Sequence, residues 1–541
     1  MTPELSGRRG ILPASAAFFA ILAAAALVSP RGFWIMDEAF GFLQVAGLES
    51  GGFRLPPAIP YPGAELLGPH ASSLRPLPYH FGSMSGGSLY CQYSPLFAIL
   101  SVPGHLALGR PGILLVPAIS CLILALFAAP LLEERGFGRI PSLSLVFFGT
   151  PVLFYGLCGW SHATALALCA AAWAAFRRSE GSAGLIVPFL LVLCASLLRE
   201  ECLAFLPVLA FAGGRKRIAV SFAALALSAL AFVSAQRLLT GSWLGTHLAS
   251  SGSEQAVYGF SGLGFFERKL FVFRTTLLSC IPGAGPVLQS AAGLILWAVW
   301  AMSRGGGRKA AILSASGCLA SAALCVSGAR GGFPLLAVME LKHPLVVIPA
   351  LWLAGKPDGR WVAPAAVLAA LVLSMEPMHA QDAAWGSRLL LAPLIMLAMV
   401  SARPPRTIVP VSVACLAATA VSLGFLAAKR ERSGRLVEEA GRLGGAVVAT
   451  SWELPGEFAE LQAEGAPVVF ADSTAEFALA LTALGPLHPV VASPAEDLVV
   501  VTGAARAAGI ILVPAVSIRF DPALEAVLLV PAGAPVADPA P

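Results

Sequence analysis

Apolar runs of about 20 residues recur along most of this 541-residue chain, and that is the length a helix needs to cross the hydrocarbon core of a bilayer. The composition agrees, because 57% of the residues are hydrophobic, 12% are charged and the mean hydropathy is +0.80. A soluble globular chain carries roughly a quarter charged residues. The sequence therefore predicts a polytopic membrane protein, and its net charge of +5 over this length predicts no nucleic-acid partner.

We expect about thirteen spanning helices of mostly apolar residues. The apolar piece from Tyr93 to Gly109 is shorter and contains two prolines, so it is expected to be a juxtamembrane or re-entrant helix. The first run follows Arg8 and Arg9 without a persuasive cleavage site and is taken as an uncleaved span. The expected spans are 11–30, 112–132, 140–158, 161–176, 183–198, 201–213, 218–236, 284–303, 310–328, 335–354, 361–376, 388–402 and 407–427.

Basic residues cluster in alternate short loops, and such loops are retained in the cytoplasm. Six loops agree on an orientation with the N-terminus inside and the C-terminus outside. We therefore expect a transmembrane domain over residues 1–430, with a long outer loop 31–110, and an outer domain over residues 431–541. Most of the ten cysteines lie in apolar stretches, so neither disulfides nor a CxxC metal site is predicted.

The C-terminal tail has a different pattern from the rest of the chain. Short β-rich runs near 445, 467, 488 and 510 alternate with helical pieces such as Glu457 to Glu464. This alternation predicts a small soluble α/β domain. No GxGxxG or GxxxxGK[ST] element occurs in the tail, so it predicts no nucleotide site.

Two adjacent carboxylates, Asp37 and Glu38, follow the first span in the sequence WIMDEAF. A carboxylate there could act as a general base for an acceptor hydroxyl or amine, or as a metal ligand. The competing interpretation is a solvated helix cap whose acids compensate the helix dipole.

Three further ionisable residues are expected at the outer ends of spans. His162 lies in GWSHATAL, and Arg199 and Glu200 lie in LLREECL. Ionisable residues near a membrane usually face a cavity or pair with each other. His162 could be a structural hydrogen bonder, and Arg199 could either pair with its neighbouring acids or bind a phosphate.

The remaining candidates lie on the same expected outer face. Lys342 and His343 lie near the tenth expected span, and Arg388 in WGSRLLLAP offers a cation and backbone donors at a helix start, which suits an anion. Tyr93, in GGSLYCQYSPLF, is a further candidate for substrate binding, although its aromatic segment taken alone indicates a membrane-interface belt.

The order and sidedness of these motifs resemble the GT-C glycosyltransferases, particularly bacterial relatives of protein O-mannosyltransferases and aminoarabinose transferases. The resemblance covers roughly residues 11–427. It is carried by the motifs WIMDEAF, LYCQYSPLFAILSVPGHLALG, GWSHA, LLREE, TGSWLGTH and WGSRLLLAPLIML.

The resemblance implies an all-α GT-C-like membrane domain that moves a sugar from a polyprenyl-phosphate carrier to a lipid, glycan or protein acceptor, outside the inner membrane of a bacterium. It implies that Asp37 is the acidic residue that takes part in catalysis and that Glu38 supports it. It also implies that Arg199 and Arg388 bind the phosphate of the carrier. Where many members have a second acidic residue this chain has Ser161 and His162, which leaves the need for a divalent metal open. The alternative functions are a transporter or flippase for a lipid-linked substrate, and a non-catalytic membrane scaffold.

Overall fold

The computed structural model describes most of the chain up to residue 240 and from residue 408 onward. Among the sequence candidates, Lys342, His343 and Arg388 lie outside the described residues, as do the expected spans 11–30, 335–354, 361–376 and 388–402. The described ranges are 32–34, 36–78, 81–85, 87–91, 93–134, 138–148, 152–179, 183–206, 218–240, 408–452, 454–519 and 525–533, with isolated positions between 209 and 316.

The chain divides into two compact units. Unit 1 comprises Met1–Ala25, Leu114–Ala235 and Glu254–Phe425, and unit 2 comprises Ala26–Ile113, Gln236–Ser253 and Leu426–Pro541. The expected outer loop 31–110 and the expected tail 431–541 thus belong to the same unit.

Unit 1 is helical throughout its described part. Its helices are α5 (Leu115–Glu133), α6 (Arg139–Phe148), α7 (Val152–Gly156), α8 (His162–Arg178), α9 (Ile186–Leu198) and most of α11 (Ile218–Thr240), with 3-10 turns η3 (Ala183–Leu185) and η4 (Glu200–Ala204). Alanine-rich α8 packs against both α5 and α9, because small residues let membrane helices approach closely.

These helices match several expected spans, but only one segment of the described chain, Arg110–Pro130, is both long and apolar enough to cross a membrane. The expected span 140–158 contains two helices, α6 and α7, and the expected span 201–213 begins as the 3-10 turn η4. The count of thirteen spans stays a prediction.

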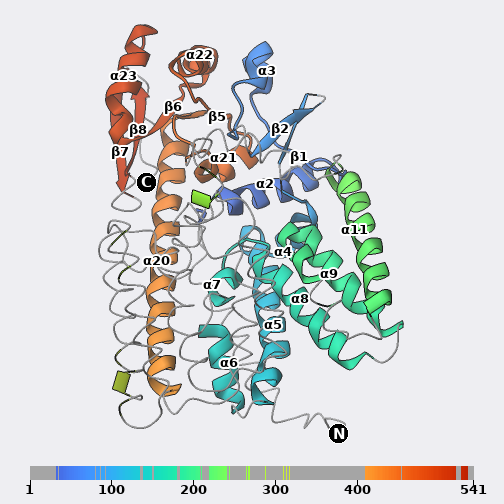
Figure 1. Ribbon diagram of the computed structural model, residues 1–541. Helices are drawn as coiled ribbons and strands as arrows, with labels where there is room; N and C mark the ends of the chain where they lie inside the picture. Colours follow the sequence, from blue (N-terminus) through green and yellow to red (C-terminus); the bar gives the residue numbers. More distant parts are fainter. Residues whose placement is uncertain are drawn as a thin grey trace. The chain divides into compact units, whose positions relative to one another are not determined.

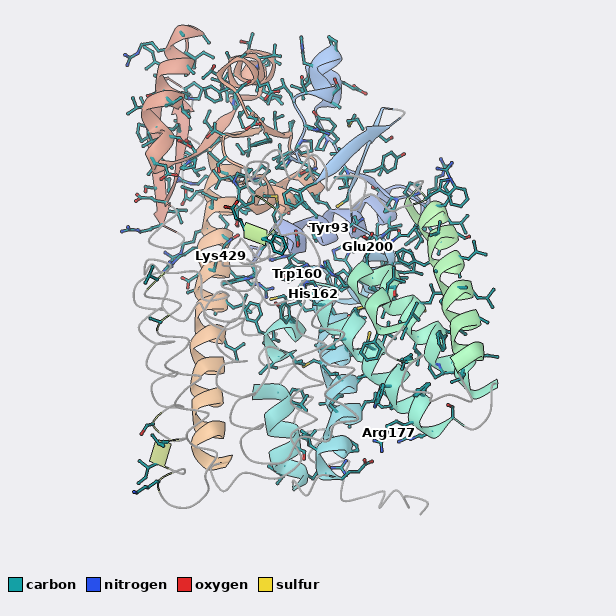
Figure 2. All side chains as sticks on the ribbon, in the orientation of Figure 1. Tyr93, Trp160, His162, Arg177, Glu200 and Lys429 are labelled. Carbon is teal, nitrogen blue, oxygen red and sulfur yellow. The ribbon has the colours of Figure 1, made fainter. Side chains whose placement is uncertain are left out.

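Hydrogen bonds and ion pairs define two opposite ends of unit 1. Ser161 Oγ donates to the Leu198 carbonyl oxygen at 3.4 Å, which joins the start of α8 to the end of α9. Arg177 Nη2 lies 2.9 Å from Glu134 Oε2, which joins the C-terminal ends of α8 and α5. Figure 2 shows Arg177 far from Trp160 and His162. The motif residues and this basic loop therefore lie at opposite ends of α8.

The first half of unit 2 begins with α2 (Met36–Ser50), followed by a small antiparallel sheet and α4 (Leu96–Leu108). The sheet has the order β1–β3–β2, from β1 (Ala58–Ile59), β2 (Gly82–Ser85) and β3 (Ser88–Cys91). The short helices α3 (Ala64–Leu67) and η1 (Gly68–Ser72) lie between β1 and β2, and η2 (Arg110–Leu114) follows α4. Helix α4 agrees with the short helix expected between Tyr93 and Gly109.

Local sequence explains the limits of α2. Asp37 and Glu38 lie in its first turn, where negative charge compensates the helix dipole. The helix ends at a glycine pair, where Gly52 has φ +65° and the Phe53 N–H bonds to the Leu48 carbonyl at 2.7 Å. Glycine is favoured there because a side chain rarely adopts positive φ.

The second half of unit 2 is the predicted α/β domain. Its sheet has the order β5–β4–β6–β8–β7, with parallel pairs among the first three strands and antiparallel pairs at β6–β8 and β8–β7. The strands are β4 (Val447–Ala449), β5 (Val468–Phe470), β6 (Val490–Pro494), β7 (Leu512–Arg519) and β8 (Glu525–Pro531), and the main helices are α21 (Ala459–Ala463), α22 (Thr474–Leu484) and α23 (Leu498–Ala507), with 3-10 turns η9 (Pro455–Phe458), η10 (Gly485–Leu487) and η11 (Ala495–Asp497).

The outer loop supplies part of the core of this α/β domain. Leu67 and Leu74 are buried in one cluster with Val448 and Val469. The Phe470 N–H, at the end of β5, donates to the carbonyl of Arg75 at 2.8 Å. Chain segments almost 400 residues apart are therefore packed into one folded body.

Helix α20 (Ile408–Leu443) runs without interruption into the α/β domain, as Figure 1 shows. Its first half is the apolar run expected as the last span, and its second half carries charged residues. The domain boundary expected after residue 430 lies inside this helix.

Candidate functional site

Asp37 lies in the first turn of α2 and is buried, with 4% of its surface exposed. The Tyr93 hydroxyl donates a hydrogen bond to Asp37 Oδ1 at 2.5 Å. Gln44 Nε2, two turns further along α2, donates to the Tyr93 backbone carbonyl at 2.9 Å. Both ends of Tyr93 are thus bound to one face of α2, and its phenol fixes the orientation of the Asp37 carboxylate.

Glu38 is equally buried but has different partners. Its Oε2 accepts a hydrogen bond from the Trp34 N–H at 2.7 Å, which satisfies one of the free N–H groups before the helix. Its Oε1 forms an ion pair with Arg430 Nη2, and the two side chains are 5% and 1% exposed. The cap interpretation therefore describes the position of Glu38, but the expectation that these acids are solvated is wrong.

A wider charged network surrounds this ion pair within unit 2. Lys429 Nζ pairs with Glu457 and also donates to the Phe33 carbonyl at 2.9 Å. Arg110 pairs with Glu460 at 2.7 Å and lies over the Phe33 ring, 4.5 Å from its centroid. The segment before α2 is therefore held by side chains from both halves of the unit.

His162 is the first residue of α8 in unit 1 and is also buried. The centroid of its ring lies 4.2 Å from that of Trp160 and 5.2 Å from that of Tyr155, and these two rings also contact each other at 5.7 Å. Figure 2 shows Trp160 and His162 side by side. His162 is therefore packed within an aromatic cluster.

Arg199 directly follows α9 as its C-cap, and Glu200 begins η4. The backbone at Arg199 is extended, with φ −147° and ψ 109°, and its N–H bonds to the Ala195 carbonyl at 2.8 Å. Both side chains are half-buried. The Ser161–Leu198 hydrogen bond brings this turn to the same end of unit 1 as His162.

The structure thus brings together Asp37 with Tyr93, and His162 with the Arg199–Glu200 turn. These two groups belong to different units. That Arg199 and Arg388 bind one carrier phosphate close to Asp37 therefore stays a prediction. No group of three or more His, Cys, Asp or Glu side chains in the described part of the chain is arranged to hold a metal ion. Those residues alone do not supply a divalent metal site beside Asp37.

Sequence reasoning missed Arg430 and its neighbours as parts of the site. A signal was present, because Lys429, Arg430 and Arg432 form a basic cluster at the end of the last apolar run, which the expected topology places outside. Cations there contradict the tendency of Lys and Arg to stay in the cytoplasm. Such a cluster suggests carboxylate partners, and the structure supplies Glu38 and Glu457.

No family model matches the chain, and no curated protein matches it. Solved structures similar to it include ArnT from Cupriavidus metallidurans in the apo state, at 12% identity and TM-score 0.45 over 98% of this chain and 99% of that one. The same protein bound to undecaprenyl phosphate gives 13% identity and TM-score 0.45 over 98% of both chains.

The archaeal oligosaccharyltransferase AglB from Archaeoglobus fulgidus, in complex with an inhibitory peptide and a dolichol-phosphate, gives 14% identity and TM-score 0.40 over 90% of this chain and 70% of that one. These proteins are GT-C fold glycosyltransferases, the class that the sequence motifs resemble. Their TM-scores are below 0.5, so the likeness itself carries none of the functional argument.

Proposed function

We propose that this protein is a membrane-embedded glycosyltransferase that moves a sugar from a polyprenyl-phosphate carrier to an acceptor on the outer face of the inner membrane. The observation that carries the proposal is the Asp37 carboxylate, which is buried at the start of α2 and oriented by the Tyr93 hydroxyl. It occurs in the motif WIMDEAF, the most distinctive part of the resemblance to the GT-C family.

In the proposed reaction the acceptor oxygen or nitrogen attacks the anomeric carbon of the donor sugar. Asp37 takes the proton of the attacking group as the new bond forms, which is the role of a general base. The bond between the anomeric carbon and the phosphate oxygen breaks, and its electron pair leaves with the polyprenyl phosphate. A single displacement of this kind inverts the anomeric configuration.

The leaving phosphate gains negative charge in this step, so fixed cations near it stabilise the transition state. We propose Arg199 and Arg388 for that role, and Glu200, His162, Lys342 and His343 as further residues that line the substrate site. A lipid carrier suits an embedded enzyme, because the prenyl chain stays in the bilayer while the phosphate reaches the outer face.

The acidic pair has divided roles in this proposal. Glu38 is bound by Trp34 and Arg430, whereas Asp37 is bound by a phenol. The bond from Trp34 and the ion pair with Arg430 occupy both carboxylate oxygens of Glu38. Asp37 is therefore the proposed base, and Glu38 supports its helix turn.

The test compares the glycolipids, glycans and glycoproteins of five strains by mass spectrometry. They are wild type, a deletion strain, and the deletion strain carrying the wild-type gene, Asp37→Asn or Asp472→Asn. A sugar that is lost on deletion should be restored by the wild-type gene, whereas Asp37→Asn should restore at least about a hundredfold less transfer. Asp472→Asn, an exposed acid in the α/β domain, is the matched control and should restore it fully.

Two outcomes would contradict the proposal. Full restoration by Asp37→Asn would return Asp37 to a structural role. If the deletion strain kept all its glycosylated products but distributed lipid-linked sugar differently across the membrane, the result would favour a transporter or flippase.

A further inference from the structure

The short segment before α2 is held almost entirely by side chains rather than by secondary structure. Five consecutive backbone groups, from the Gly32 N–H to the Trp34 N–H, each meet a side-chain partner. These contacts are Gly32 N–H to Glu460 at 3.3 Å, Gly32 carbonyl to Arg110, Phe33 N–H to Ser433 Oγ at 3.1 Å, Phe33 carbonyl to Lys429 at 2.9 Å and Trp34 N–H to Glu38 at 2.7 Å.

Most of these partners come from the C-terminal part of the chain. Lys429, Arg430 and Ser433 lie on one stretch of α20, and Figure 2 marks Lys429 on that helix. Ser433 accepts from the Phe33 N–H and donates to Glu457, so it links the segment to η9. Side chains of α20, and through them η9, therefore fix the position of this segment.

Close backbone approach makes the fit specific. Gly32 has φ +79°, and a Cβ atom there would lie 2.4 Å from Ser433 Cβ and 2.6 Å from the Arg430 carbonyl oxygen. A Cβ atom on Gly456 would lie 3.1 Å from Met36 Cα, in the first turn of α2. A side chain at either position would clash, so these close approaches of α20 and η9 to the segment and to α2 require glycine.

The Glu38–Arg430 ion pair is more buried than the Arg110–Glu460 and Lys429–Glu457 pairs. A buried ion pair adds little net stability, because desolvation offsets the attraction, but separating its members leaves uncompensated charge and is strongly unfavourable. The pair therefore specifies one arrangement more than it stabilises the fold. Asp37 and Glu38 are consecutive in one helical turn, so an arrangement that fixes Glu38 also fixes the Asp37 backbone.

We infer that Arg430 is a positioning residue for Asp37, acting through Glu38, and that the C-terminal domain thereby sets the geometry of the site. The inference rests on the proposed function only for its catalytic consequence. Displacing a catalytic group by about 1 Å can reduce turnover roughly a hundredfold. Arg430 does not touch the reacting atoms in this scheme.

The test uses the full-length protein with four changes: Arg430→Gln, Arg430→Lys, the double change Glu38→Gln with Arg430→Gln, and Arg435→Gln. Arg435 is on the same helix in an exposed pair with Glu431, so it is the matched control. The double variant removes both charges and keeps the protein testable if Arg430→Gln alone fails to fold.

Hydrogen–deuterium exchange gives a readout independent of activity. Residues 32–40 of Arg430→Gln should exchange at least about tenfold faster than in wild type, while β6 and α5 stay unchanged, because local opening is governed by local contacts. Unchanged exchange in residues 32–40 of Arg430→Gln, or of Arg430→Lys if Arg430→Gln does not fold, would overturn the inference whatever the protein catalyses.

Kinetics then test the catalytic consequence. Arg430→Gln should lower kcat about ten- to a hundredfold per folded molecule with the KM for the donor changed less than about twofold. The kcat of Arg430→Lys should lie between those of Arg430→Gln and wild type, because lysine keeps the charge without the guanidinium fork. The kcat of the double variant should be higher than that of Arg430→Gln. A loss that only tracks the folded fraction would make Arg430 merely structural. Faster exchange together with an inactive wild type would overturn the proposed function and leave the contact standing.

Discussion

Replacing Tyr93 by phenylalanine tests the orientation of the proposed base. The change removes only the hydroxyl that donates to Asp37 Oδ1 and keeps the ring, whose centroid lies 6.4 Å from that of Phe81. The bond from the Tyr93 carbonyl to Gln44 is also kept, since it uses the backbone. The perturbation is therefore confined to one hydrogen bond at the carboxylate.

The magnitude follows from the charge of the acceptor. A hydrogen bond to a charged group contributes about 1.5–3 kcal/mol, and each 1.36 kcal/mol in the transition-state barrier is a factor of ten in rate. If the bond holds Asp37 in its working orientation, Tyr93→Phe should lower kcat/KM by about ten- to a hundredfold. The loss should be smaller than that of Asp37→Asn, because the base is still present.

The assay measures release of polyprenyl phosphate, with the donor identified from the strain comparison, and the melting temperature of each variant. Tyr90→Phe is the control, since it makes the same chemical change on the neighbouring strand β3. Turnover of Tyr93→Phe equal to that of Tyr90→Phe would refute the orienting role. A fall in activity that matches a fall in folded protein would refute it as well.

Three further predictions follow from the outer parts of the chain. Leu74→Ala should lower the stability of the α/β domain by about 2–5 kcal/mol, measured by thermal unfolding, because Leu74 is fully buried in the core of that domain although it is far from it in sequence. A loss under about 1 kcal/mol would contradict the shared core. Burial raises the pKa of Tyr61, and Arg75 opposes the rise. Above about pH 10 this tyrosine ionises in the unfolded state before it does so in the folded state, so the free energy of unfolding should fall as the pH rises. The fall should be less steep in Tyr61→Phe, and equal slopes of stability against pH in the two proteins would contradict this. A reporter fused at the C-terminus should be active only outside the cytoplasm and one inserted near Lys216 only inside, and the reverse result would overturn the expected topology.

The α/β character of the tail could be predicted because its parallel strands are short buried runs such as Val447–Ala449 and Val468–Phe470, bounded by turn residues. Strand β8 was missed. Its sequence EAVLLVP combines Glu, Ala and Leu, which favour helices, and only its pairing with β6 and β7 makes it a strand. Tertiary context overrides local preference there.

The candidate site was predictable only where its chemistry is local. Asp37 and Tyr93 stand out in their own motifs, and the structure joins them. The Glu38–Arg430 pair spans 392 positions, so no periodicity or spacing near Glu38 could identify its partner. The tail was likewise expected to be separate, because hydropathy reveals where a chain leaves the membrane but not which outer segments share a core.

The division between Asp37 and Glu38 follows from helix geometry. Consecutive residues of an α-helix point about 100° apart, so two adjacent acids in the first turn of α2 face different surroundings. Glu38 faces α20 and is neutralised by Arg430, whereas Asp37 faces the segment that carries Tyr93. An adjacent pair is therefore poorly arranged to chelate one ion with both carboxylates. It is well arranged to let one acid anchor the helix turn while the other keeps a fixed direction for chemistry, and the anchoring acid binds a residue 392 positions later in the chain. On this reasoning the C-terminal domain must be folded against the outer loop before Asp37 has its working geometry.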